Sequence, residues 1–456
     1  MTMLDGRITN VPHVPRARAF LDARAMIRNP LEVFERYRAE LGPTFSFHFG
    51  GAKPVLVSTS PDFIQHVLQR NSRNYHMSDI RVKRMAEFQG EGLLNSHGDA
   101  WLAKRRFLAQ GFLRSRLAEL FPIQERLVQD VLAQVDVEAA RGPLDMYRTL
   151  SSLTFRLVGQ ALFGTRMRDD EIERLGTTIL TVQQFMVRQI VQPYLIPWFR
   201  LRGESRRHQR MRTEGEAIVR AHIEARRRAR GEVRGDLLQL ILDAPEEEHG
   251  AWSADQILIE IMQLLVAGNE TSPVALSWTF HLLGKHPAVL RAMREEVDAV
   301  FGSGPITFAG IHQLRLTLRV LDEAMRLYPS FWMIDRCALE DDEADGIRIP
   351  AGVTVVPYIY GVHRNPEVWE APERFDPTRF EDEARKGRHP FAHIPFGGGP
   401  RKCIGSNMAI VQMLLVLATL LRRYDFEPTG GGMVDMAPMM ILHPKGSIEM
   451  RVRRRA

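Results

Sequence analysis

The sequence predicts a mainly helical protein with small β-sheets, an α+β fold. Three observations lead to this prediction. Apolar side chains recur with helical periodicity from about residue 99 to residue 300. Two short runs, 44–49 and 54–59, are rich in β-branched and aromatic residues and predict strands joined at the glycine pair 50–51. One later apolar segment is long enough to form a buried central helix.

The central helix is expected to begin at a capping box made by Ser253 and Gln256 and to run to about Leu283. This is roughly 30 residues, or about 45 Å at 1.5 Å per residue. Its apolar residues point to nearly every side, so the helix should be buried. Gly268 and Pro273 are expected to loosen or kink it.

Two polar groups in the middle of this helix need an explanation. Glu270 and Thr271 cost free energy in a buried helix unless they have hydrogen-bond partners or a chemical task. They can be read as structural groups at a proline kink or as functional groups. Before this helix, segment 191–203 is apolar and aromatic and contains Pro193 and Pro197, which predicts a loop with exposed apolar side chains.

The C-terminal third is expected to contain a helix, a hairpin and an irregular segment. Glu323 and Arg326 are three residues apart on one helix face and can pair, usually as a weak surface salt bridge. Pro329 ends that helix. Apolar runs on both sides of 350–352 predict a hairpin with its turn at this point.

Composition excludes several classes of protein. The chain of 456 residues has two cysteines, Cys337 and Cys403, which cannot form a disulfide framework, so a reducing compartment is expected. Zinc and iron–sulfur spacings are absent. The formal charge of +6 is modest, and the arginine clusters at 206–212 and 451–455 belong to no nucleic-acid-binding module. The N-terminus has no signal-peptide or membrane-spanning run, so we expect a soluble, cytoplasmic protein without a transmembrane anchor.

The loop "FGGGPRKCIG" (396–405) places one cysteine among glycines and basic residues. Arg401, Lys402 and the N-terminus of the following helix favour the thiolate of Cys403. The glycines let the backbone approach something flat or bulky. Such a cysteine can be a nucleophile, although the sequence places no histidine base beside it. It can also be an axial ligand of haem iron, or a buried structural cysteine.

The motifs and their order along the chain resemble the cytochrome P-450 superfamily of haem-thiolate monooxygenases. The haem loop of that family reads Phe-x-x-Gly-x-Arg-x-Cys-x-Gly, and every fixed position is matched, by Phe396, Gly399, Arg401, Cys403 and Gly405. The resemblance implies one haem-thiolate domain over 1–456, with a long distal helix, a proximal cysteine loop and no fused reductase.

Further motifs extend the resemblance over most of the chain. "WLAKR" matches the Trp-x-x-x-Arg of the family, and "AGNETS" (267–272) matches its oxygen-activating helix. Glu323 and Arg326 match Glu-x-x-Arg, and the resemblance implies that Arg374 in "PERF" completes a structural Glu–Arg–Arg network. It assigns His393 no fixed role, and we interpret this residue as structural.

The resemblance implies a haem b cofactor with Cys403 as its metal ligand. Phe396 would pack beside the haem, and arginines would bind its propionates. The implied cofactor-binding residues are Trp101, Arg105, Ala267, Gly268, Arg336, Phe396, Arg401, Cys403 and Gly405.

Glu270 and Thr271 are the implied catalytic residues. Thr271 would hold dioxygen or an ordered water, and Glu270 would supply protons. Because peroxide-using or isomerising members often lack this acid–alcohol pair, its presence favours a dioxygen-dependent monooxygenase. A peroxygenase or isomerase stays open as an alternative, and so does a haem-thiolate sensor without turnover.

Electrons must come from a separate protein, because the sequence contains no glycine-rich dinucleotide fingerprint. The resemblance implies a ferredoxin or flavodoxin with its NAD(P)H-dependent reductase. Lys402, Arg422 and Arg423 are expected to form a basic proximal face for an acidic partner, or else to be solvated or propionate-facing charges.

The implied substrate is lipophilic, such as a fatty acid, terpenoid or steroid, and would be hydroxylated or epoxidised. Segment 92–112 resembles fatty-acid and long-chain-lipid hydroxylating members more than small-terpene ones. The expected pocket residues are Met85, Phe88, Phe185, Leu264, Phe331 and Trp332.

Overall fold

The computed structural model describes residues 8, 10–48, 54–164, 167–228, 235–244, 252–430, 432 and 434–455. The chain divides into two compact units, which are described separately. The sheet unit comprises Met1–Val82, Asp322–Cys403 and Met436–His443, and the helical unit comprises Lys83–Leu321, Ile404–Asp435 and Pro444–Ala456. Two helices continue from one unit into the other, α5 (Asp79–Gln89) and α17 (Arg315–Leu327).

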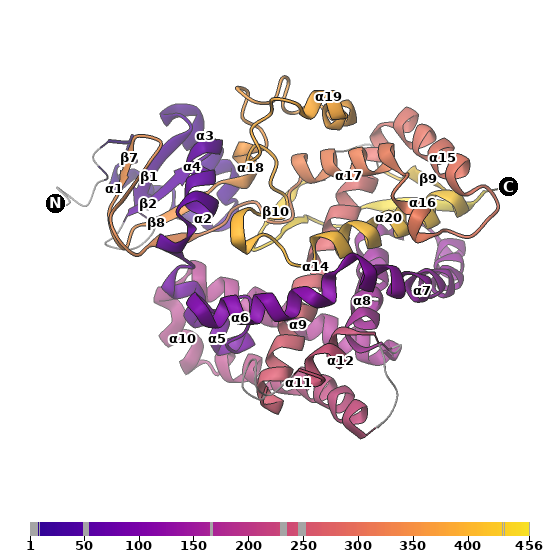
Figure 1. Ribbon diagram of the computed structural model, residues 1–456. Coiled ribbons are helices and arrows are strands. Elements are labelled where there is room, and N and C mark those ends of the chain that lie inside the picture. Colours follow the sequence, from indigo (N-terminus) through magenta and orange to yellow (C-terminus); the bar gives the residue numbers. More distant parts are fainter. Residues whose placement is uncertain are drawn as a thin grey trace. The chain divides into compact units, whose positions relative to one another are not determined.

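The sheet unit is built on a five-stranded sheet in the order β1-β2-β8-β5-β3. Its elements are α1 (Arg16–Leu21), α2 (Ala23–Arg28), α3 (Pro30–Leu41), β1 (Thr44–His48), β2 (Pro54–Ser58), α4 (Pro61–Gln65), η2 (His66–Arg70), η3 (Ser72–Asn74), β3 (Tyr75–His76), β5 (Arg336–Ala338), β6 (Asp342–Ala344), β7 (Ile347–Ile349), β8 (Thr354–Pro357), α18 (Ile359–Val362), η6 (Pro377–Phe380), α19 (Asp382–Arg385), η7 (Gly399–Arg401), β10 (Met436–Pro438) and most of β11 (Leu442–Pro444). Figure 1 shows β1, β2 and β8 side by side.

The predicted strand pair at the N-terminus is confirmed as β1 and β2, which are antiparallel with Thr44 opposite Ser58. Residue 49 and the glycine pair 50–51 lie outside the described residues. β2 continues the sheet in parallel with β8, with Val55 opposite Thr354. Leu56 of β2 and Val355 of β8 pack into one buried apolar cluster.

The predicted hairpin around 350–352 is wrong. β7 pairs antiparallel with β6, and the turn between them contains Asp345 and Gly346, both with positive φ. β8 instead joins the larger sheet between β2 and β5. The reason is burial: Val355 is fully buried at the centre of that sheet, which a two-stranded hairpin would not provide.

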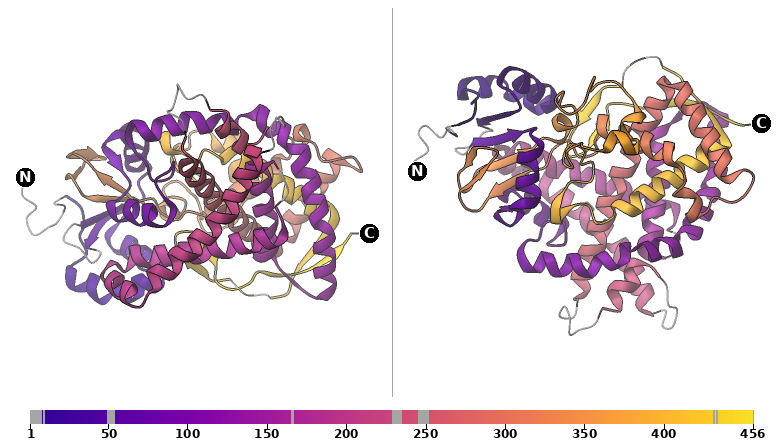
Figure 2. Two further views of the ribbon diagram at one scale, coloured as in Figure 1. Left: turned by 90° about the horizontal axis from the view of Figure 1, so that it is seen from below. Right: turned by 45° about the horizontal axis from the view of Figure 1, so that its top comes forward.

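The helical unit packs around α14 (Ala254–Lys285), beside which α8 lies (Figure 1). The other views show further helices around it (Figure 2). The remaining elements are α6 (Gly98–Ala109), η4 (Gln110–Phe112), α7 (Arg114–Arg141), β4 (Leu144–Asp145), α8 (Met146–Phe163), α9 (Asp169–Val191), η5 (Pro193–Leu195), α10 (Ile196–Leu201), α11 (Glu204–Arg228), α12 (Leu237–Leu242), α15 (Pro287–Phe301), α16 (Phe308–Ile311), α20 (Ser406–Arg423), β9 (Tyr424–Pro428) and β12 (Glu449–Arg454).

The central helix is confirmed as α14, and one correction concerns the segment before it. Ser253 caps α14 by accepting a hydrogen bond from the Gln256 N–H at 3.1 Å. α14 is continuous through Pro273, and the kink expected at Gly268 and Pro273 stays a prediction. Segment 191–203 is not a loop, because η5 and α10 form there, but Trp198 and other apolar side chains in it are exposed as predicted.

One helix among the described residues, α20, is long and apolar enough by composition to cross a membrane, and 61% of it is buried inside the protein. A core helix meets the same criterion, and burial on this scale is typical of one.

Candidate functional site

Cys403 lies on a short loop between η7 and α20. The Cys403 N–H donates to the carbonyl of Phe396 at 2.9 Å, and the Lys402 N–H donates to the carbonyl of Gly399 at 3.1 Å. These bonds turn the loop back on itself and fix its backbone. Cys403 is exposed and forms no disulfide among the described residues. The loop therefore presents a single sulfur on a rigid backbone.

Three consecutive glycines give this loop its path. Gly397 and Gly399 have φ of 71° and 65°, where residues with a side chain are strained. A Cβ on Gly399 would lie 1.7 Å from the carbonyl oxygen of Leu68, and one on Gly398 would lie 2.4 Å from the ring of Phe391. The glycine run is thus required by close backbone packing within the sheet unit as well as by its turns.

The Glu323–Arg326 pair predicted from spacing is confirmed, but it is not a weak surface bridge. Arg326 donates to both carboxylate oxygens of Glu323, at 2.7 and 2.8 Å, and both side chains are fully buried. Arg326 also donates to the carbonyls of His363 and Pro372, at 2.8 and 2.7 Å. A buried ion pair with all its donors occupied locks α17 to the irregular segment after α18.

The third member of this network is Arg379, and the prediction of Arg374 is wrong. The Arg379 Nε lies 3.6 Å from a Glu323 carboxylate oxygen, and its side chain is 10% exposed. The Arg374 side chain is 66% exposed and pairs with Asp376, while only its backbone carbonyl accepts from Arg326, at 3.2 Å. The sequence contains Pro-x-Arg-Phe twice, at 372–375 and 377–380, and the second copy supplies the network.

His393 is structural, as interpreted from the sequence. Its ring shares a hydrogen bond of 3.2 Å with the carbonyl of Asp322 and packs 4.7 Å from the ring of Phe380, centroid to centroid. Burial lowers the pKa of His393 to about 3, so the ring is neutral in the working range of pH.

In the helical unit, α14 has one open stripe. Between residues 260 and 283, all of which are described, only Leu264, Ala267, Gly268 and Thr271 are partly exposed. Their spacing of three, four and seven residues places them on one face of the helix. Leu264, predicted for the substrate pocket, therefore shares one face of α14 with Ala267, Gly268 and Thr271, which were predicted for cofactor binding and catalysis.

Gly268 and Thr271 have local roles in α14 that the sequence did not reveal. A Cβ on Gly268 would lie 2.8 Å from a methyl group of Val158, so the missing side chain lets α8 pack closely against α14. The Thr271 hydroxyl donates to the carbonyl of Ala267 at 3.1 Å, which orients the side chain along the helix.

Glu270 points away from the open stripe into a buried polar cluster. The Gln183 amide of α9, oriented with its nitrogen toward the carboxylate, donates to both oxygens of Glu270 at 3.1 and 3.0 Å; the reverse orientation would oppose oxygen to oxygen. Burial raises the pKa of Glu270 to about 7. Burial, together with the charge of Glu270, raises the pKa of Tyr147 on α8 to about 12. Glu270 can thus hold or release a proton near neutral pH.

α6 carries Trp101 and Arg105, one helical turn apart, and both are partly buried. Lys104, next to Arg105, was not singled out from the sequence. Its ammonium lies 2.8 Å from a carboxylate oxygen of Glu260 on α14, and that carboxylate also accepts from the Leu93 N–H at 2.9 Å. The sequence did contain a sign of this ion pair, because Glu260 is an acid inside an otherwise apolar run and needs a partner when buried.

Comparison with known proteins decides the family. A family model described as Cytochrome P450 matches residues 12–452. The chain belongs to the cytochrome P450 family. It is 31% identical over 422 residues to cyclooctatin synthase of Streptomyces melanosporofaciens, covering 92% of this chain and 90% of that protein. It is 29% identical over 408 residues to cyclooctat-9-en-7-ol 5-monooxygenase of the same organism, covering 89% and 87%. The predicted fold class and the predicted monooxygenase family are confirmed.

Membership in the P450 family implies a haem held by a cysteine thiolate, and residues of the sheet unit fit such a group. In this unit, burial lowers the pKa of the Arg336 guanidinium to about 10. Arg336 donates to the carbonyl of Asp335 at 2.8 Å, whereas the Asp335 carboxylate is bound by Arg81. An additional carboxylate, such as a haem propionate, would stabilise this buried cation. The exposed Cys403 of the same unit fits the role of the iron ligand.

The predicted substrate-pocket residues of the P450 fall into three groups. Trp332 does not line a pocket, because it is buried against Phe34 and Tyr358 and donates to the carbonyl of Met439 at 2.7 Å. Met85, Phe88 and Phe185 are buried among protein side chains. Leu264 and Phe331 are partly exposed.

The ring of Phe185 lies 5.7 Å from the ring of Phe88, centroid to centroid. Its ring also stacks on His208 of α11 at 3.9 Å and meets Phe199 of α10 at 5.5 Å. Phe185 therefore joins α9 to α10 and α11 and is enclosed by other aromatic rings.

The three basic residues predicted to form one proximal face belong to different units. Lys402, in the sheet unit, is exposed beside Cys403. Arg422 and Arg423, in the helical unit, lie at the C-terminal end of α20. There Arg422 donates to the carbonyl of Gly304 at 2.6 Å, and Arg423 pairs with Asp136 at 2.8 Å. The shared basic face stays a prediction.

Proposed function

We propose that this P450 inserts one oxygen atom of dioxygen into a lipophilic substrate, with Cys403 as the thiolate ligand of haem b. The haem supplies the activation of dioxygen. The observation that supports this most directly is the geometry of the cysteine loop, in which one exposed cysteine lies on a rigid, glycine-rich backbone. Arg336 and Arg401 in the sheet unit, and Trp101 and Arg105 in the helical unit, would bind the propionates.

The proposed proton path uses the two neighbouring residues of α14. Thr271 lies on the open stripe, where its hydroxyl would hold dioxygen or a water. Glu270 lies on the buried side, and its pKa of about 7 suits a group that gives up and regains a proton at neutral pH. Glu270 and Thr271 are consecutive residues of a continuous helix. The proton would therefore pass from Glu270 in the buried cluster to Thr271 on the open stripe.

We infer a bulky or long-chain lipophilic substrate. The open stripe of α14 presents Leu264, Ala267 and Gly268, which offer apolar contacts and no charge. Cyclooctat-9-en-7-ol 5-monooxygenase acts by its name on the alcohol cyclooctat-9-en-7-ol, and this chain is similar to it over most of its length. That similarity adds polycyclic or cyclic alcohols to the fatty acids, terpenoids and steroids to be screened.

We propose that 1–456 form one haem-thiolate domain and that electrons come from a separate ferredoxin or flavodoxin with its NAD(P)H-dependent reductase. The P450 match occupies residues 12–452, so these 456 residues contain no second catalytic module. A cytoplasmic location is supported by Cys337 and Cys403, neither of which forms a disulfide among the described residues.

The deciding test is the absorption spectrum of the reduced protein with and without carbon monoxide, for wild type and for Cys403→Ala. A strongly red-shifted Soret band that is absent in the variant is expected. Absence of haem, or an unchanged histidine-type spectrum in the variant, would overturn the proposal. Product formation with dioxygen and a redox pair, compared with peroxide alone, then separates monooxygenase from peroxygenase.

A further inference from the structure

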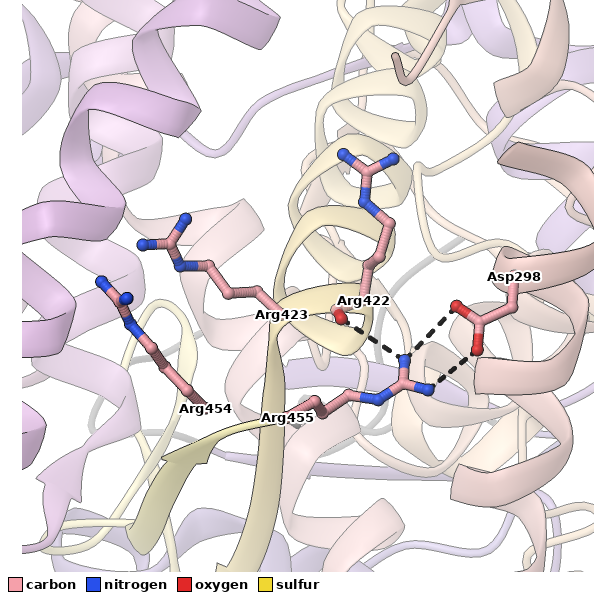
Figure 3. A pocket seen from close by; sticks show the side chains of 5 residues that line it. All are labelled: Asp298, Arg422, Arg423, Arg454 and Arg455. Atoms are coloured by element: carbon pink, nitrogen blue, oxygen red, sulfur yellow. Dashed lines mark hydrogen bonds and ion pairs between the residues drawn. The ribbon is translucent and has the colours of Figure 1, made fainter. Parts of the chain in front are cut away.

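A cavity of about 360 Å³ lies at the C-terminal end of α20, where three segments of the helical unit meet (Figure 3). Four arginines and one acid line it: Asp298 on α15, Arg422 and Arg423 at the end of α20, and Arg454 and Arg455 at the end of the chain's last strand. We call it the arginine pocket. Its volume falls within the range of small-molecule sites, about 300–1,000 Å³.

Two of the lining residues neutralise each other. Arg455 donates to both carboxylate oxygens of Asp298, at 3.3 and 2.9 Å (Figure 3). It also donates to the carbonyls of Leu421 and Arg422, at 3.2 and 3.4 Å, so it is fixed in place and contributes no net charge.

Two of the other three arginines share a single carboxylate. Arg423 and Arg454 both pair with Asp136 of α7, which also accepts from the Tyr424 hydroxyl at 2.8 Å. The third, Arg422, donates to a backbone carbonyl and pairs with no carboxylate among the described residues. Three guanidinium groups and one carboxylate leave two positive charges without compensation.

The residues around the pocket do not supply the missing negative charge. Arg294 pairs with Asp425 at 2.9 Å, and Arg453 pairs with Glu427 at 3.6 Å, so each of these acids is already matched. The Arg423 Nε is buried and has no hydrogen-bond partner among the described residues, so one donor at the pocket is left unsatisfied.

We propose that the arginine pocket binds a doubly charged oxyanion, namely the phosphate or diphosphate group of a small molecule or lipid. A dianion matches the two uncompensated charges. The planar forks of Arg422 and Arg423 suit the bidentate geometry of phosphate oxygens. This inference concerns a site that the proposed oxygen chemistry does not use.

Calorimetric titration of the haem-loaded protein with inorganic pyrophosphate, at constant ionic strength, tests the proposal. Saturable binding is expected for wild type, and Arg422→Gln is expected to weaken it about tenfold or more, the usual effect of losing a hydrogen bond to a charged group. The matched control is Arg453→Gln on β12, whose side chain is 60% exposed and lies outside the pocket lining. It should change the affinity by less than about twofold, as for exposed ion pairs.

A second arm distinguishes the source of the phosphate. Vesicles of phosphatidylcholine with and without phosphatidic acid are tested for co-sedimentation. Binding of pyrophosphate indicates a soluble ligand, whereas binding only to phosphatidate vesicles that is lost in Arg422→Gln indicates a lipid headgroup. No saturable binding in either arm, or equal weakening by Arg453→Gln, would overturn the proposal. If Arg422→Gln does not fold, Arg454→Gln replaces it, because its side chain is 64% exposed.

Discussion

The amide of Gln183 donates to both carboxylate oxygens of Glu270, at 3.1 and 3.0 Å, inside the helical unit. The two side chains come from α9 and α14, and both are buried. Burial raises the pKa of Glu270 to about 7. A neutral amide therefore holds an acid that changes its charge at neutral pH.

This raised pKa predicts a pH-dependent effect of Glu270→Gln on stability. The ordinary pKa of this carboxyl is 4.5, so between that value and about 7 the folded protein holds a proton that the unfolded chain has lost. Wild-type stability should fall as the pH rises through this window, and the variant should not share that loss. We expect the variant to gain about 1–3 kcal/mol over wild type at about pH 8, and much less at about pH 5. Urea unfolding at both pH values measures this.

The control for this prediction is Glu383→Gln on α19, whose side chain is 82% exposed. Its effect on the free energy of unfolding should be small and independent of pH. A Glu270→Gln effect of equal size at both pH values would contradict the raised pKa.

Two different substitutions of Gln183 should shift the pKa of Glu270 in opposite directions. Gln183→Met removes the donors that stabilise the carboxylate, which should raise the pKa of Glu270 further. Gln183→Lys places a cation beside it, which should lower that pKa. The yield of product per electron consumed should fall as the pH rises and Glu270 loses its proton. Relative to wild type, we expect this fall about one pH unit higher in Gln183→Met and about one pH unit lower in Gln183→Lys.

An infrared measurement checks this without turnover. The band of the protonated carboxyl, assigned by its loss in Glu270→Gln, should titrate in the same order as the pH profiles of the Gln183 variants. If Gln183 were purely structural, both variants would lower the yield at every pH. The carboxyl band of Glu270 would then titrate at the same pH in both variants as in wild type.

The buried network of the sheet unit predicts a clear difference between two arginines five residues apart. Arg379→Ala should cost about 1–3 kcal/mol of unfolding free energy, because it removes a largely buried cation that lies 3.6 Å from the buried Glu323 carboxylate. Arg374→Ala should cost less than about 1 kcal/mol, because its ion pair with Asp376 is exposed. Urea unfolding of both variants measures this, with haem content as a second readout. Equal losses of unfolding free energy in Arg379→Ala and Arg374→Ala would show that Arg374 also belongs to the buried network.

Sequence reasoning reached the parts of this protein that short motifs define. The cysteine loop, the long helix with Glu270 and Thr271, and the Glu323–Arg326 pair all lie where spacing predicted them. Each depends on residues close together in sequence, whose geometry follows from a helix or a tight turn.

Reasoning from the sequence failed where contacts between distant segments decide. β8 pairs with β2, about three hundred residues earlier, and a local hairpin pattern cannot reveal such a partner. Trp332 is apolar and near the motif after Pro329, yet packing against α3 makes it a core residue. Gln183 and Lys104 each pair with an acid on α14, so no pattern within their own helices marks them.

The cysteine loop predicts that Gly399→Ala and Gly387→Ala will differ, although both glycines have positive φ, 65° and 78°. At Gly387 a Cβ would meet nothing within 4 Å, so only backbone strain of about 1 kcal/mol is expected. At Gly399 the same atom would lie 1.7 Å from the Leu68 carbonyl oxygen, which is backbone and cannot turn aside. The cysteine loop would have to move, taking the Cys403 sulfur with it. Gly399→Ala should therefore lose most of its bound haem and of its red-shifted carbon monoxide band, whereas Gly387→Ala should keep both. Normal haem binding by Gly399→Ala would show that the loop relaxes without displacing the thiolate.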